Sequence, residues 1–123
     1  MLLQIDEKRI EPGIVVLELT GRFALGRESQ RLESIVDELV KEGCTRAILD
    51  LTGVDYCDSA GIGLIALAAG RLKEAGGRLV AVAADGRVLE MLKMTQIDQI
   101  VTVRSTAKQA VDAFGESHPP ANA

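Results

Sequence analysis

The chain has 123 residues, of which 47% are hydrophobic and 26% charged, and 18 acidic residues against 14 basic ones give a formal net charge of -4. A chain of this length folds as one domain and needs no disulfide or metal to bury a core. Its aromatic residues are Phe23, Tyr56 and Phe114 alone. Because nucleic-acid binders rely on positive charge and on stacking rings, this composition excludes nucleic acid as a primary partner.

The cysteines, the histidine and the first residues of the chain indicate which kinds of site and which cellular compartment to expect. Cys44 and Cys57 are too far apart for a CxxC redox pair, and the single His118 stands in a proline-rich end, so neither a cofactor nor a metal-ligand cluster is expected. The chain becomes charged too early for a signal peptide, and no stretch approaches the roughly 20 apolar residues of a membrane span. We therefore expect a cytoplasmic protein with reduced thiols and no membrane span.

Two strands open the predicted element order. They cover about 2–9 and 14–20, and the residues at 11–13, Glu-Pro-Gly, form the turn of a hairpin between them. Apolar residues then recur at helical spacing, which predicts a helix over about 27–42. The apolar stripe of this helix consists of Leu32, Ile35, Val36, Leu39 and Val40.

The remaining elements continue the alternation. They are a strand over 46–51, a polar loop over 52–58, a helix from Ser59 to the Gly76-Gly77 pair, a strand over 78–83, a helix over 86–94, a strand over 100–103 and a last helix from about 107. Asp85 is the expected N-cap of the third helix, and Ser105 or Thr106 that of the last one. This order predicts an α/β fold: one domain over 1–115 with a mixed, mostly parallel sheet, an N-terminal hairpin and about four helices. We expect residues 116–123 to form a disordered tail.

Function is best indicated by residues 48–67, ILDLTGVDYCDSAGIGLIAL, where a buried strand leads through a polar loop to a helix start. If the helix begins at Asp58 or Ser59, the serine hydroxyl lies beside unpaired backbone N–H groups and the positive end of the helix dipole, a place that tolerates an added anion. Gly61 and Gly63 each cost about 1 kcal/mol of helix propensity where nothing local demands them. Bare backbone there would let another molecule approach closely.

Four other interpretations of these residues are a helix cap, a serine hydrolase, a dinucleotide site and a metal site. Asp58 or Ser59 in a purely structural role would only cap the helix. A serine hydrolase needs a base near the serine, but the one histidine is in the tail. Residues 61–66 satisfy a dinucleotide fingerprint by letter, yet they do not directly follow the strand. A metal site would require Asp50, Asp55 and Asp58 to converge with a further ligand, and none is evident.

The central motif, LDLTGVDYCDSAGIGLI, is preceded by VVLELTGRF and followed by AGGRLVAVAADGRVLEMLKMTQIDQIVTV. These segments resemble the STAS domain of bacterial anti-sigma factor antagonists over about residues 15–114. The resemblance implies a non-catalytic regulator that switches partners. Its unmodified form would bind an anti-sigma factor that is also a serine kinase, phosphorylation of the motif serine would break the complex, and a serine phosphatase would restore it.

Carried onto this sequence, the resemblance makes Ser59 the phosphoacceptor. The partner-binding surface is then expected to comprise Asp55, Asp58, Ser59, Ala60, Gly61, Gly63 and Arg22. A phosphate adds about -1.5 to -2 charges at pH 7, which a helix N-terminus tolerates but a packed partner surface does not. Because aromatic residues are so few, we expect the partner surface to consist of aliphatic side chains and glycine backbone.

The chain departs from the family pattern after the Leu-Thr-Gly of residues 19–21. Many phosphorylatable antagonists carry an aspartate shortly after that point, whereas this sequence has Arg22 and Arg27, which are either solvated or face an acidic partner or the phosphate. Ala60 stands where a second serine is more usual. These departures keep open a STAS subunit of another assembly, such as a stress-signalling or lipid-transport complex. A small nucleotide-binding domain is the alternative from a different class.

Overall fold

The structure is a computed structural model and describes residues 2–11 and 13–115. In chain order its elements are β1 (Gln4–Glu11), β2 (Ile14–Phe23), α1 (Arg27–Glu42), β3 (Arg46–Cys57), α2 (Ser59–Glu74), β4 (Arg78–Val82), α3 (Arg87–Met94), the short 3-10 helix η1 (Ile97–Gln99), β5 (Thr102–Arg104) and α4 (Ala107–Ala113). The predicted order of strands and α-helices is confirmed, and η1 is an addition to it. The predicted tail at 116–123 lies outside the described residues.

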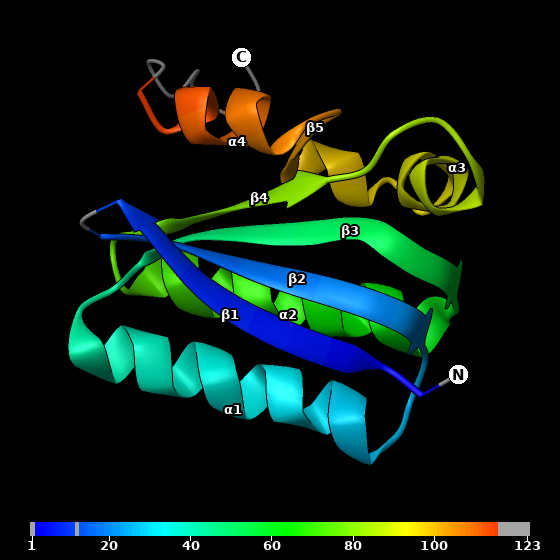
Figure 1. The fold of residues 1–123 in the computed structure, drawn as a ribbon, viewed down its shortest axis with the longest axis horizontal. Coiled ribbons are helices and arrows are strands. Elements are labelled where there is room, and N and C mark those ends of the chain that lie inside the picture. Colours follow the sequence, from blue (N-terminus) through cyan, green and yellow to red (C-terminus); the bar gives the residue numbers. More distant parts are fainter. Residues whose placement is uncertain (1, 12, 116–123) are drawn as a thin grey trace.

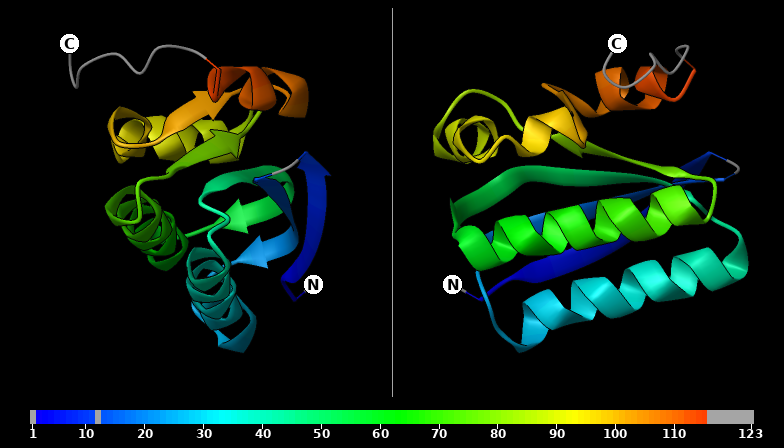
Figure 2. Two further views of the ribbon diagram at one scale, coloured as in Figure 1. Left: turned by 90° about the vertical axis from the view of Figure 1, so that its left-hand side faces the viewer. Right: turned by 180° about the vertical axis from the view of Figure 1, so that it is seen from behind.

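Five strands form one mixed sheet in the order β1-β2-β3-β4-β5. β1 and β2 make an antiparallel hairpin, and every other neighbouring pair is parallel (Figure 1). Helices α1 and α2 lie side by side on one face of the sheet, and α4 lies on the opposite face (Figure 2). The α/β class, the N-terminal hairpin and the mostly parallel sheet are therefore as predicted.

Two apolar clusters hold these layers together. Strands β3 and β4 bury side chains on both faces, so the middle of their pairing, residues 47–49 and 79–81, is apolar without alternation. The larger cluster packs α1, α2 and α3 against the sheet and includes Leu17, Leu32, Leu49, Ile65, Leu72 and Leu92. The smaller cluster lies beneath α4 and consists of Ile14, Val16, Ile48, Val80, Val82, Ala110 and Ala113.

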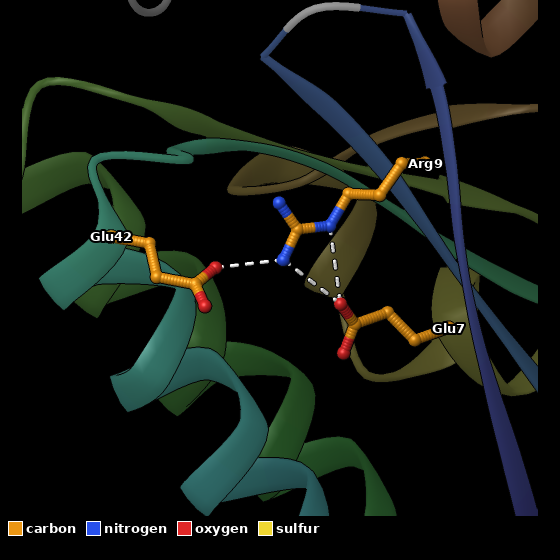
Figure 3. A network of polar contacts seen from close by, with 3 residues as sticks. All are labelled: Glu7, Arg9 and Glu42. Carbon is orange, nitrogen blue, oxygen red and sulfur yellow. Dashed lines mark hydrogen bonds and ion pairs between the residues drawn. The ribbon is translucent and has the colours of Figure 1, made fainter.

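The edge strand β1 is tied to the end of α1 by a polar network. The Nη2 atom of Arg9 lies 2.7 Å from Oε1 of Glu42 and 3.0 Å from Oε2 of Glu7 (Figure 3). All three side chains are well exposed, and exposed ion pairs contribute little to stability. The network therefore serves mainly to place charge on an edge strand, which discourages pairing with other chains.

The two strands that lead to the predicted site are longer than predicted. β2 ends at Phe23 and β3 at Cys57, and these two residues are partners in the parallel ladder. The predicted end of β2 at Thr20 is too early, and the prediction of a polar loop over 52–58 is wrong, because only Asp58 lies outside the strand. Register shifts within this ladder break the alternation that marks a strand in a sequence.

The caps of the two C-terminal α-helices differ from each other in chemistry. The N-cap of α3 is Gly86, not the predicted Asp85, and its φ of 140° is a value that favours glycine. For α4, Thr106 is the cap, since its hydroxyl accepts a hydrogen bond from the Gln109 N–H at 3.1 Å. One of the two residues predicted to cap α4 is thus confirmed.

Candidate functional site

Asp58 caps the N-terminus of α2. Its Oδ1 accepts a hydrogen bond from the backbone N–H of Gly61 at 3.0 Å, and its own backbone is extended, as at other N-caps. The N–H of Asp58 donates to the carbonyl of Phe23 at 3.3 Å, which fixes the helix start against the end of β2. The predicted helix start is confirmed, and the capping residue is Asp58 and not Ser59.

Ser59 is the first residue of α2, and it is exposed. Within the part of the chain that the structure describes, its hydroxyl makes no hydrogen bond. The first turn of a helix has unpaired backbone N–H groups and carries the positive end of the helix dipole. The hydroxyl is therefore open to a reagent from solvent, and a phosphate attached to it would lie where an anion is stabilised.

Gly61 and Gly63 lie in different environments. Gly61 is buried, and a Cβ atom there would lie 2.6 Å from the carbonyl oxygen of Phe23 and 3.1 Å from the sulfur of Cys57. The interpretation that nothing local demands a glycine is therefore wrong for Gly61, because the close approach of β2 requires one. Gly63 is exposed, and a Cβ atom there would meet nothing within 4 Å, so its bare backbone faces solvent.

The other predicted site residues come from the ends of β2 and β3 and from the start of α2. Of the predicted surface, Arg22, Asp55, Ser59 and Gly63 are exposed, Asp58 and Ala60 are half-buried, and Gly61 is buried. The carboxylate of Asp50 lies earlier in β3 and accepts hydrogen bonds from the backbone and hydroxyl of Thr52 at 3.0 and 2.8 Å. Among the described residues, no group of three acidic, cysteine or histidine side chains is placed to hold a metal ion.

Arg22 and Tyr56 form a stacked pair at the ends of β2 and β3. They are partners in the ladder, and the guanidinium carbon of Arg22 lies 3.8 Å from the centre of the Tyr56 ring. Tyr56 is 40% exposed, and Leu25, in the link that follows β2, is 71% exposed. An exposed aromatic ring therefore lies three residues before Ser59, beyond the aliphatic side chains and glycine backbone that we expect of the partner surface. Sequence reasoning missed Tyr56 because residues 52–58 were interpreted as a loop, which hid its pairing with Arg22.

Cys57 lies between the exposed pair and the helix start. Burial, with a further contribution from the negative charge of Asp58, raises the pKa of its thiol from 9.0 to about 11. The sulfur lies 3.6 Å from the carbonyl oxygen of Asp58. At neutral pH the thiol is therefore protonated and a poor nucleophile.

Comparison with known proteins agrees with this geometry. Residues 7–110 match the family model of the STAS domain. The relative named "Putative anti-sigma factor antagonist BtrV", from Bordetella bronchiseptica, is 30% identical over 91 residues, which cover 74% of this chain and 78% of that one. The crystal structure of an anti-sigma factor antagonist from Mycobacterium paratuberculosis matches with a TM-score of 0.82 at 18% identity, over 94% of this chain and 96% of the other.

A third similar protein, SpoIIAA of Bacillus, has been solved in two forms. The unphosphorylated form of this anti-sigma factor antagonist matches with a TM-score of 0.74 at 18% identity, over 93% of this chain and 100% of the other. The phosphorylated form matches with a TM-score of 0.66 at 17% identity, over 90% and 99%. At these identities the likeness shows a common fold.

The sheet order, the helix start at Asp58 and the sequence match define one class of protein. The chain belongs to the STAS domain family, and within it to the anti-sigma factor antagonists. In the stretches 2–11 and 13–115, no helix combines the length and the apolar character that crossing a bilayer requires.

Proposed function

We propose that this chain is a partner-switching regulator whose unphosphorylated form binds an anti-sigma factor that is also a serine kinase. Phosphorylation of Ser59 ends that binding, and a serine phosphatase restores it. The observation that carries the proposal is the exposed hydroxyl of Ser59 at the first position of α2, which has no capping duty because Asp58 performs it. The existence of a phosphorylated form of the similar protein SpoIIAA supports the proposal.

The phosphoryl transfer needs little from this chain. The Ser59 oxygen attacks the γ-phosphorus of ATP held by the kinase, the bond to ADP breaks, and the hydroxyl proton passes to a base of the kinase. Oδ1 of Asp58 holds the Gly61 N–H and the Cys57 thiol is protonated, so we assign the base to the kinase. The chain acts as a substrate and a binding partner, not as an enzyme. Because its proposed kinase uses ATP and a sigma factor acts in transcription, we propose that the chain works in the cytoplasm.

The same geometry explains how one phosphate switches binding without unfolding the domain. The helix N-terminus stabilises the new charge from within the fold, whereas a partner packed on Ser59 would have to desolvate a dianion. Asp55 is exposed nearby in the sequence, and Asp58 adjoins the serine. Their charges add to that of the phosphate, so a partner that supplies no cation at Ser59 is repelled more strongly.

The test is to incubate the purified chain with its anti-sigma kinase and ATP and to map phosphate by mass spectrometry. We expect one phosphate, on Ser59, and none in Ser59→Ala. A matched control is Ser105→Ala, because Ser105 is also exposed beside a helix whose cap is the neighbouring residue, and this variant should be modified as wild type. Phosphate absent from wild type, or confined to other residues, would overturn the proposal.

A further inference from the structure

An aromatic ring holds Arg22 on the surface, and no acidic side chain within residues 2–11 and 13–115 does so. Its guanidinium lies 3.8 Å over the Tyr56 ring. Among the described residues it makes no hydrogen bond and no ion pair. Stacking occupies one face of the guanidinium plane, whereas the N–H donors point outward from the edges of that plane. The pair therefore presents a set of N–H donors that no residue of the described stretches accepts from.

The ion pairs of two other arginines in the fold show what a guanidinium group binds here. Arg71 of α2 is held by Glu33 of α1, at 3.0 Å, and by Asp37 of the same helix. Arg9 of β1 contacts two glutamates in the same manner. The chain has 18 acidic residues against 14 basic ones, yet none of the acidic residues that the structure describes contacts Arg22. The chemistry that fits the Arg22 guanidinium is a carboxylate from another molecule.

The pair and Ser59 lie at the same end of the sheet, where β2 and β3 finish and α2 begins. Tyr56 is three residues from Ser59, so their Cα atoms are at most about 11 Å apart. The N–H of Asp58 also bonds the carbonyl of Phe23, the residue after Arg22. A typical interface covers about 800 Å² on each partner, which is wide enough to include both the serine and the stacked pair. Tyrosine and arginine are also the side chains that most often dominate binding energy at interfaces.

We propose that the Arg22–Tyr56 pair is the anchor of the kinase interface and that it binds a carboxylate side chain of the anti-sigma kinase. This inference rests on the proposed function and specifies the partner's chemistry. Asp55 and Asp58 accompany Arg22, so the surface does not suit a polyanion such as a nucleic acid or a lipid membrane, whereas a protein supplies a single carboxylate. A phosphate on Ser59 repels that carboxylate, so phosphorylation weakens the contact between the Arg22–Tyr56 pair and the kinase.

The test measures Kd by titration calorimetry between the chain and the purified kinase that phosphorylates Ser59, at low and high salt. We expect Arg22→Gln to weaken binding about 10- to 100-fold, with a smaller loss at high salt. Lys108→Gln is the matched control, because it removes the same charge from an exposed position of α4, and it should bind as wild type. Melting curves of both variants should match that of wild type, because both side chains are exposed.

A charge-reversal experiment then identifies the carboxylate. Each exposed acidic residue of the kinase is changed to lysine and tested against wild type and Arg22→Glu. We expect one kinase variant that binds wild type poorly and recovers affinity with Arg22→Glu. Wild-type affinity in Arg22→Gln, or no kinase residue that couples to position 22, would overturn the anchor while leaving the phosphoswitch intact. A kinase that phosphorylates Ser59 yet forms no measurable complex with wild type would overturn the anchor as well.

Discussion

The Oδ1 atom of Asp58 accepts a hydrogen bond from the backbone N–H of Gly61 at 3.0 Å, and this contact decides what Ser59 is available to do. A serine at a helix start commonly serves as the N-cap, and its hydroxyl is then bound to the backbone. Here the aspartate before it performs that task. The serine is left at the first helical position with an exposed hydroxyl, which suits a modification site.

Removal of the cap should weaken the fold by a moderate amount. Asp58→Ala leaves the Gly61 N–H without its acceptor and should lower the free energy of unfolding by about 1 kcal/mol. Asp58→Asn keeps a side-chain oxygen at this position and should lose much less. Urea unfolding of the two variants measures the difference. Equal stability of Asp58→Ala and wild type would show that the cap contributes nothing.

The two glycines of α2 should respond in opposite directions to the same change. Gly61→Ala places a methyl group 2.6 Å from the Phe23 carbonyl oxygen and should destabilise the fold by about 1–3 kcal/mol. Gly63→Ala enters open space and should stabilise the helix by up to about 1 kcal/mol. Thermal unfolding of both variants gives the comparison. If Gly61→Ala were as stable as Gly63→Ala, β2 would not approach α2 as closely as the structure shows.

A negative charge at position 59 should leave the fold intact. Ser59→Asp puts a carboxylate in the first turn of α2, where the helix dipole stabilises it by about 0.3–1 kcal/mol at low ionic strength. The melting temperature should therefore equal or slightly exceed that of wild type, and the gain should shrink in high salt. A clear loss of stability would contradict the argument that the helix terminus accommodates phosphate.

The pH dependence of stability should carry a contribution from Cys57. Burial raises the pKa of its thiol from 9.0 to about 11 in the folded chain. Between these values the unfolded state binds fewer protons than the folded state, so this contribution to stability falls as pH rises through that window. Urea unfolding at several alkaline pH values should show a steeper decline for wild type than for Cys57→Ser, whose hydroxyl does not titrate. Parallel declines would contradict the shift.

Much of the fold was predictable because its signals are local. The stripe that includes Leu32 and Val36 follows the helical period, and the strand that becomes β4 is a short apolar run between glycines and polar residues. The site was harder to predict, because the extension of β3 to Cys57 depends on pairing with the end of β2. A bulged ladder with polar exposed residues has no distinct sequence period.

Two site residues depend on contacts that no spacing reveals. Gly61 is buried because β2 passes over it, so its lack of a side chain serves packing and not access. The guanidinium of Arg22 lies over the Tyr56 ring because the register of β2 and β3 makes the two residues partners. By contrast, the helix start and the exposed Ser59 were predictable, because the Asp-Ser-Ala-Gly order is a local signal for a capped helix.

The central claim is that phosphate on Ser59 abolishes partner binding while the domain stays folded. The most direct measurement is the Kd of the kinase for the chain before and after stoichiometric phosphorylation, with circular dichroism melting of both forms. We predict a loss of affinity of about 100-fold or more and an unchanged or higher melting temperature. Equal affinity of the two forms, or unfolding of the phosphorylated chain, would contradict the account.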